Sequence, residues 1–186
     1  MKRLFDLLLA VVIVPLILAP LLIVVLLVKL TSKGPVLYWS DRNGRDNRVF
    51  KMPKFRSMRT GTPAVATHLL DNPRSHLTPI GGFIRKSSLD ELPQLWTIIK
   101  GDMSFVGPRP ALFNQEDLIK LRTQQGIHKL VPGLTGWAQI NGRDELTIPE
   151  KVALDFEYMQ KQSLLTDLHI LWLTVVRVIA LEDVSH

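Results

Sequence analysis

The chain has 186 residues, enough for one compact domain and a small appendage but too few for two full-sized cores. Its net charge of +6 predicts an anionic partner, such as acidic lipid, a phosphorylated substrate or nucleic acid. The sequence has no cysteine, which excludes disulfides, thiolate metal sites and a thiol nucleophile.

Residues 4–28 form an apolar run that is interrupted by a single formal charge, Asp6. As a straight helix this run would reach roughly 37 Å, enough to cross a hydrocarbon core of ~30 Å. A cleaved signal peptide fits poorly, because the run is about twice as long as a signal core and no small-residue cleavage site follows it. The segment is therefore predicted to stay in the membrane.

Two features favour a re-entrant helical hairpin for residues 1–30 over a single membrane span. Pro15 and Pro20 lie within the run, where each removes a backbone hydrogen bond, so a kink is expected near one of them. Basic residues also flank both ends of the run, whereas a spanning helix usually keeps them on the cytoplasmic side only. Both ends are therefore predicted on one side of the membrane, with a single-span anchor as the alternative.

The remaining residues, 31–186, are predicted to form one polar body of the α/β class, mostly helical with a small β-hairpin. The hairpin is indicated by two β-type runs around Asn43-Gly44, which is a turn signal. An irregular loop is predicted over 61–79, and helical patterns follow it. The expected elements are strands at 35–39 and 48–52, helices at 80–100, 115–125 and 151–180, a loop at 132–136 and a turn at 141–143.

The last helix is predicted to break near Ser163, and from Leu164 onward leucine, valine and tryptophan recur at spacings of three and four. An amphipathic helix with Trp172 on its apolar side is suited to lie in a membrane interface. A helix packed on a protein core would show the same pattern, so both interpretations stay open.

The segment from Arg85 to Gln94 has two interpretations. In the structural one, Ser88 caps a helix and Glu91 bonds back to it. In the chemical one, the helix start and Arg85 attract phosphate. Asp90 and Glu91 would then stay ionised, able to hold Mg²⁺ or to attack a phosphorus atom. Adjacent helical residues point about 100° apart, so separate roles are expected for the two acids.

Basic residues are frequent between positions 42 and 59, which indicates either a solvated face beside an anionic membrane or phosphate binding. Lys54 and Arg56 are the best candidates for phosphate contacts in this stretch. Farther along, Gly107-Pro108-Arg109-Pro110 predicts a rigid turn that could hold its arginine for a bidentate grip on phosphate. A surface turn with a solvated arginine is the alternative.

Four segments occur in order after the proline-containing apolar start. They are Lys54-Phe-Arg-Ser-Met58, Ser88-Leu-Asp-Glu-Leu-Pro-Gln94, Gly101-Asp-Met-Ser-Phe-Val-Gly-Pro-Arg-Pro110 and Pro132-Gly-Leu-Thr-Gly-Trp-Ala-Gln-Ile-Asn-Gly-Arg143. Over nearly its whole length the chain resembles the bacterial sugar transferases called monotopic phosphoglycosyl transferases. Since the length leaves little room for other domains, the minimal catalytic form is expected.

The resemblance implies a re-entrant membrane helix (1–30) and a catalytic domain (31–186) on the cytoplasmic face of the bacterial inner membrane. It also implies a Mg²⁺-dependent ping-pong reaction. Asp90 would be the nucleophile and a metal ligand, and Glu91 its catalytic neighbour. Contacts to substrate phosphate would come from Lys54, Arg56, Arg85, Pro108 and Arg109, and contacts to the nucleotide or carrier from Gln139, Asn141, Gly142 and Arg143. One departure is visible, because the family often has Ser-Pro at the membrane kink and this chain has Ala19-Pro20.

The partners implied by the resemblance are a UDP-sugar, polyprenyl (undecaprenyl) phosphate and membrane lipid, with no nucleic acid; an oligomer is left open. Two rival functions remain. In one, Asp90 and Glu91 only hold Mg²⁺ and the lipid phosphate attacks directly in a ternary complex. In the other, the protein is a basic membrane-anchored module that binds anions and catalyses nothing. The identity of the sugar is not determined by the sequence.

Overall fold

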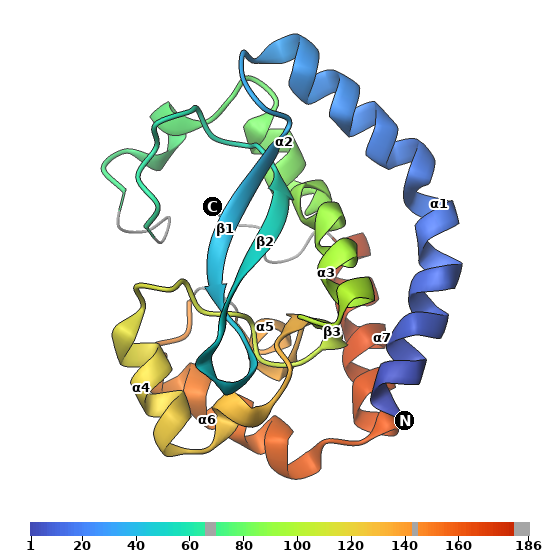
Figure 1. Ribbon diagram of the computed structural model, residues 1–186, viewed down its shortest axis with the longest axis vertical. Helices are drawn as coiled ribbons and strands as arrows, with labels where there is room; N and C mark the ends of the chain where they lie inside the picture. Colours follow the sequence, from blue (N-terminus) through green and yellow to red (C-terminus); the bar gives the residue numbers. More distant parts are fainter. Residues whose placement is uncertain (66–69, 143–144, 181–186) are drawn as a thin grey trace.

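The computed structural model describes residues 1–65, 70–142 and 145–180. This part of the chain is mostly helical and contains two small two-stranded sheets, which confirms the predicted α/β class (Figure 1). One long N-terminal helix borders the body along one side (Figure 1).

That helix, α1 (Lys2–Thr31), runs through Pro15 and Pro20 as one element, and it curves as it follows the body (Figure 1). It is long and apolar enough to cross a membrane, and most of its outward leucines and valines are exposed. The predicted hairpin does not take the form of two separate helices, because the chain stays helical through both prolines. The re-entrant path itself stays a prediction.

The predicted β-hairpin of the polar body is confirmed. Strands β1 (Leu37–Asn43) and β2 (Val49–Phe55) pair antiparallel over their full length, from Leu37 opposite Phe55 to Asn43 opposite Val49. The connection is longer than a two-residue turn, because the 3-10 turn η1 (Arg45–Asn47) lies within it. Asp46 and Asn47 have φ angles of 54° and 59° and so reverse the chain in the left-handed region.

The single helix predicted over 80–100 is wrong. The structure has α2 (Gly81–Lys86), the 3-10 helix η4 (Leu89–Gln94) and α3 (Leu95–Lys100). Ser88 separates the first two with a φ of 55°, a left-handed conformation that no continuous helix accommodates. The break lets η4 leave the axis of α2 and pack against β2.

Two strands were missed because they are only three residues long. Strand β3 (Ser104–Val106) pairs parallel with β4 (Gly133–Thr135), which lies inside the segment predicted as a loop. The pairing depends on glycine, since a Cβ atom at Gly133 would lie 2.1 Å from the amide nitrogen of Gly107. Close backbone contact therefore explains Gly107, Gly133 and Gly136 in these two motifs.

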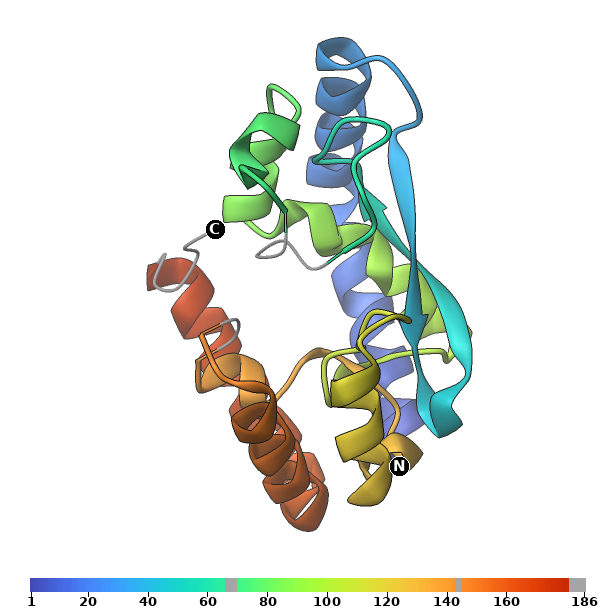
Figure 2. The ribbon, with the colours of Figure 1, turned by 90° about the vertical axis from the view of Figure 1, so that its left-hand side faces the viewer.

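The helices that follow include those predicted at 115–125 and 151–180, together with two short ones that were not predicted. They are α4 (Glu116–Gln124), the short turns η5 (Ile127–Lys129) and α5 (Trp137–Ile140), then α6 (Ile148–Lys161) and α7 (Leu164–Ala180). The break near Ser163 is confirmed, and a capping box of Thr147 and Glu150 begins α6. Helix α7 and the β1–β2 hairpin lie on opposite sides of the body (Figure 2). The outward side chains Leu165 and Trp172 of α7 are exposed.

Candidate active site

The structure brings together charged residues from three separate segments. Glu91 on η4 accepts hydrogen bonds at Oε1 from Lys54 Nζ on β2 (2.8 Å) and from Arg109 Nη2 in the turn after β3 (2.7 Å). Its neighbour Asp90 places Oδ2 4.0 Å from the same lysine. The three motifs that carry these residues thus form one cluster.

The predicted capping box at Ser88 is wrong. No side-chain capping bond is made by Ser88, which has a left-handed backbone, and the Glu91 carboxylate binds Lys54 and Arg109 instead. The acids are therefore directed into the site and do not stabilise a helix end.

A cavity of about 650 Å³ surrounds this cluster and is large enough for a nucleotide-sized ligand. Asp90 and Glu91 line it together with many cationic side chains. These cations are Arg42, Lys54, Arg56, Arg59, Arg85, Arg109, Arg122 and Lys151. Such an excess of positive charge favours a ligand with several phosphate groups.

The two acids titrate differently. Burial raises the pKa of Asp90 to about 6, with a further contribution from Glu91, while Lys54 opposes the shift. Burial acts in the same direction on Glu91, but the charges of Arg109 and Lys54 outweigh it and hold the pKa of Glu91 well below its usual range. The expectation that both acids are ionised therefore holds near neutral pH, and Asp90 loses its charge as the pH falls below about 6.

The turn that presents Arg109 is held by two other arginines. Arg122 Nη1 donates to the carbonyl of Arg109 (2.7 Å), and Arg42 Nη1 donates to the carbonyl of Pro110 (3.2 Å). Arg122 is in turn oriented by the buried Asp155 of α6, which accepts from its Nε and Nη2 at 2.9 and 2.6 Å. The predicted rigid turn is confirmed.

Arg122 and Asp155 were missed in the sequence analysis. They lie 33 positions apart, and no local pattern indicates that they meet. Arg42 was visible only as one of several basic residues in its stretch. Its pKa is lowered to about 10 by burial and by the nearby Arg109.

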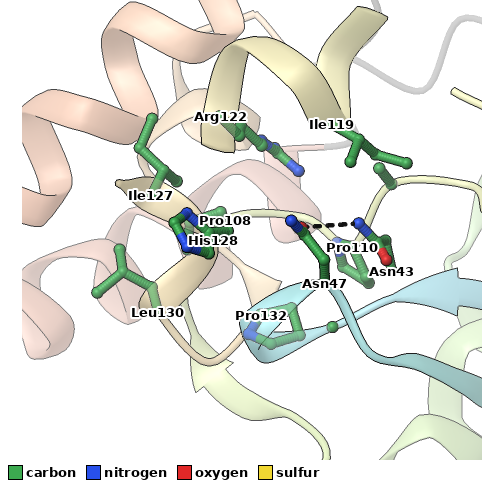
Figure 3. A pocket seen from close by; sticks show the side chains of 12 residues that line it. Asn43, Asn47, Pro108, Pro110, Ile119, Arg122, Ile127, His128, Leu130 and Pro132 are labelled. Carbon is green, nitrogen blue, oxygen red and sulfur yellow. Dashed lines mark hydrogen bonds between the residues drawn. The ribbon is translucent and has the colours of Figure 1, made fainter. Parts of the chain in front are cut away.

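Pro108 connects the turn to the neighbouring strand β4 by a backbone hydrogen bond. Its carbonyl accepts from Gly133 N, and Gly107 N donates to Thr135 O, both at 2.9 Å, so the loops after β3 and β4 are joined. Pro108 lines a smaller pocket of about 30 Å³, shown in Figure 3, where Asn43 and Asn47 are hydrogen-bonded at one side. This pocket has room for about one water molecule, so it is too small for a nucleotide-sized ligand.

Among the other predicted phosphate ligands, Arg85 lines the large cavity. Arg56 lines it too but is otherwise engaged in the fold, because its guanidinium donates to the carbonyl of Pro35 (2.6 Å) and to Ser32 Oγ (2.9 Å). These bonds hold the chain between the end of α1 and the start of β1.

The predicted nucleotide or carrier residues are only partly brought to the cavity. Gln139 lines it and is buried. Asn141 and Gly142 follow α5 and are absent from the described lining of the cavity. Arg143 lies outside the described residues.

The described residues contain no cluster of three or more acids or histidines that could enclose a metal ion. Mg²⁺ often uses only one or two protein carboxylates and completes its coordination with substrate phosphates and water. Asp90 fits this pattern because it lines the cavity, whereas Glu91 already binds two cationic side chains. The residues therefore suit a Mg²⁺ ion that arrives with an anionic substrate.

Comparisons with known proteins identify the family of the chain. Residues 1–181 match the family described as Bacterial sugar transferase. The chain is 42% identical over 95% of its length to an undecaprenyl-phosphate glucose phosphotransferase of Komagataeibacter xylinus, and it covers 35% of that protein. The same identity and coverage of this chain hold for a UDP-glucose:undecaprenyl-phosphate glucose-1-phosphate transferase of Escherichia coli, of which it covers 40%.

The uncharacterized sugar transferase EpsL of Bacillus subtilis is 40% identical over the whole chain, and 90% of its own length is covered. The chain thus spans about a third to two fifths of some relatives and nearly all of another. Because the family match includes the apolar helix and all four motifs, the chain belongs to the bacterial sugar transferase family.

Proposed function

We propose that this protein transfers a sugar 1-phosphate from a UDP-sugar to polyprenyl (undecaprenyl) phosphate, releasing UMP and forming a polyprenyl diphosphate-sugar. The observation that carries the proposal is the buried Asp90 beside the Lys54–Glu91–Arg109 cluster, in a cation-lined cavity of about 650 Å³. Two relatives are named as enzymes that transfer glucose phosphate to undecaprenyl phosphate, and they support the same reaction.

In the first step, an Asp90 carboxylate oxygen attacks the phosphorus that carries the sugar. A phosphorus–oxygen bond forms as the bond to the UMP oxygen breaks, and the leaving UMP keeps the electron pair. In the second step, an oxygen of polyprenyl phosphate attacks the same phosphorus and the Asp90 carboxylate leaves. The two anionic substrates then need not occupy the cavity together.

The surrounding charges are arranged for this chemistry. Lys54 and Arg109 come from different segments, and both bind Glu91. Their positive charges would stabilise the negative charge on the transferred phosphate. Glu91 holds both cations in place, which suits the role of catalytic neighbour better than that of nucleophile. Mg²⁺, bound by Asp90 and the substrate phosphates, would offset the repulsion between anionic reactants.

The nucleophile is tested by intact mass spectrometry. Purified protein is incubated with Mg²⁺ and a panel of UDP-sugars, without lipid acceptor, and wild type is compared with Asp90→Asn. Asp41→Asn is the matched control, because Asp41 pairs with Lys51 on the surface away from the cluster. Wild type and control should gain one phosphosugar mass and release UMP, while Asp90→Asn should gain none.

The other outcomes separate the rival mechanisms. If no adduct forms but polyprenyl phosphate yields lipid-linked product, the covalent step is wrong and direct transfer in a ternary complex replaces it. If no UDP-sugar gives an adduct or a product, the enzymatic proposal fails and the anion-binding module is favoured.

The proposal also places α1 as a re-entrant helix in the bacterial inner membrane, with the body on the cytoplasmic face and α7 in the interface. Both ends of α1 are bound to the body. Lys2 Nζ lies 2.5 Å from Asp167 Oδ2 on α7, and Ser32, directly after the helix, accepts from Arg56. One polar body can hold both ends only if they lie on the same side of the membrane.

This topology is tested by cysteine labelling. The chain has no cysteine of its own, so only the introduced cysteine can react. One variant carries a cysteine directly after Met1 and another carries Lys33→Cys. An impermeant maleimide should label both only in inside-out vesicles. Labelling of the two sites from opposite sides would replace the re-entrant helix with a single span.

A further inference from the structure

The first five residues of α1 include three charged ones, and each binds a different part of the body. Lys2 pairs with Asp167 of α7. The guanidinium of Arg3 donates to the carbonyls of Ile98 and Ile99 at the end of α3. The first turn of α1 therefore joins elements that are far apart in the chain, as its position beside β3 and α7 also indicates (Figure 1).

Asp6 completes this arrangement. Its side chain is buried, with the residue only 3% exposed, in a helix whose neighbouring residues are mostly apolar and exposed. Oδ1 accepts from Ser104 Oγ at 3.0 Å and from Phe105 N at 3.2 Å. Burying a carboxylate costs free energy unless it is hydrogen-bonded, and attachment to lipid does not require a carboxylate. The two hydrogen bonds to β3 therefore explain why an aspartate occupies this buried position.

The elements that Arg3 and Asp6 bind lead directly to the candidate active site. Strand β3, held by Asp6, is followed by Gly107 and the turn that presents Arg109. Helix α3, whose last carbonyls Arg3 binds, is preceded without a break by η4, the element of Asp90 and Glu91. A displacement of either element would change the distance between Arg109 and Glu91.

A second chain of contacts reaches β3 from Lys2. The Tyr158 hydroxyl donates to Asp167 Oδ1 at 2.7 Å and lies 3.4 Å from the carbonyl oxygen of Val106. Burial, together with Asp167, raises the pKa of Tyr158 far above its usual value, so the hydroxyl keeps its proton and remains a donor. Strand β3 is thus bound near its start by Asp6, and its end lies beside the Tyr158 hydroxyl.

We propose that Asp6 is a positioning residue of the transfer reaction, fixing β3 through Phe105 and Ser104 so that the following turn presents Arg109 to the reacting phosphate. This inference rests on the proposed function. The membrane helix is then part of the catalytic architecture as well as an anchor. A shift of about 1 Å at a catalytic group can lower a rate by about 100-fold, so a small displacement of β3 is sufficient.

The test compares Asp6→Leu with Asp6→Asn in the full chain, reconstituted in lipid. Asparagine keeps an oxygen that can accept both hydrogen bonds, whereas leucine has the same branching of its side-chain heavy atoms, a larger volume and no acceptor. Asp6→Leu should lower kcat by about tenfold or more while the KM for the UDP-sugar changes little. Asp6→Asn should stay within about threefold of wild type, and the control Asp41→Asn should be unchanged.

Hydrogen exchange gives a readout that does not depend on turnover. In Asp6→Leu the amide of Phe105 should exchange at least about tenfold faster than in wild type, because its acceptor is gone. Ser104→Ala removes the other hydrogen bond to Asp6 by a change outside the membrane helix. It should lower kcat moderately and add no further loss to Asp6→Leu, as expected for two residues acting through one contact.

Several results would overturn the inference. One is wild-type kcat, or unchanged exchange at Phe105, in Asp6→Leu. Another is an equal loss in Asp6→Asn, which would make charge the important property instead of hydrogen bonding. Release of Asp6→Leu from membranes by alkaline carbonate would assign Asp6 to anchoring. If wild type transfers no phosphosugar at all, the proposed function fails, and the exchange data still decide whether Asp6 holds β3.

Discussion

The active-site cluster and the outer face of α1 are stabilised in different ways. In the cluster, each charged side chain has a defined partner, as in the contacts of Glu91 with Lys54 and Arg109. On the outer face of α1 the large exposed hydrophobic side chains are mostly leucine and valine, which form no hydrogen bonds or ion pairs. Residue identity should therefore matter greatly in the cluster, while on the outer face of α1 only apolar character should matter.

The largest effect is expected where a buried ion pair supports the cluster. Asp155→Ala leaves Arg122 buried without its carboxylate, and the pair's side chains are only 1% and 11% exposed. Breaking such a pair costs about 3–5 kcal/mol of unfolding free energy, so the melting temperature should fall by roughly 10 °C. Asp41→Ala, which removes the exposed partner of Lys51, should change it by less than about 2 °C. Equal shifts in both variants would show that burial of the Arg122 pair is unimportant.

Arg109→Ala should affect catalysis more than folding. The guanidinium binds Glu91 and lines the large cavity, so its loss should lower kcat by about 10²–10³-fold with little change in melting temperature. Arg109→Lys should recover only part of the rate, because an ammonium group lacks the bidentate fork. Arg45→Ala, at an exposed arginine, is the control. A loss of less than fivefold for Arg109→Ala would place the transferred phosphate elsewhere.

Gly136→Ala tests the backbone contact behind the turn. An added Cβ would lie 2.1 Å from the carbonyl oxygen of Gly107, so the loops after β3 and β4 must separate. We expect a destabilisation of about 1–3 kcal/mol and a reduced transfer rate. At Gly82 the nearest atom would be 3.8 Å away, and Gly82→Ala should be neutral or slightly stabilising. Thermal unfolding of both variants in detergent measures the difference, and similar behaviour would contradict the steric argument.

The smallest effect is expected on the outer face of α1. Leu16 is 73% exposed, and Leu16→Val should change neither membrane retention nor transfer rate by more than about twofold. Val28, which is fully buried against the body, provides the contrast, since Val28→Ala should cost about 1–2 kcal/mol. A large loss of activity in Leu16→Val would mean that this face makes specific contacts.

Several local features were predictable because neighbouring residues determine them. The hairpin, α4, and the break between α6 and α7 follow from turn signals and from apolar spacing. The four motifs also indicated Asp90, Glu91, Lys54 and Arg109 through the family resemblance. Their meeting in one cluster was implied by that resemblance, and the structure supplies the distances.

Other features depend on contacts that no local pattern contains. A serine followed three residues later by glutamate indicates a helix cap, yet Ser88 breaks the helix because Glu91 binds cations from two distant segments. Likewise, β3 and β4 are too short to be recognised alone, and each exists because the other pairs with it.

The amino-acid sequence by itself determined the apolar helix, the basic character of the body, the order of most elements and the chemical types at the site. Only the tertiary structure decided that Arg42, Arg122 and Asp155 support the turn and that Asp6 binds β3. The physical reason is the separation along the sequence over which each kind of interaction acts. Periodicity and turn chemistry act over a few residues, whereas hydrogen bonds between buried groups join positions as far apart as 6 and 105 once the chain has folded.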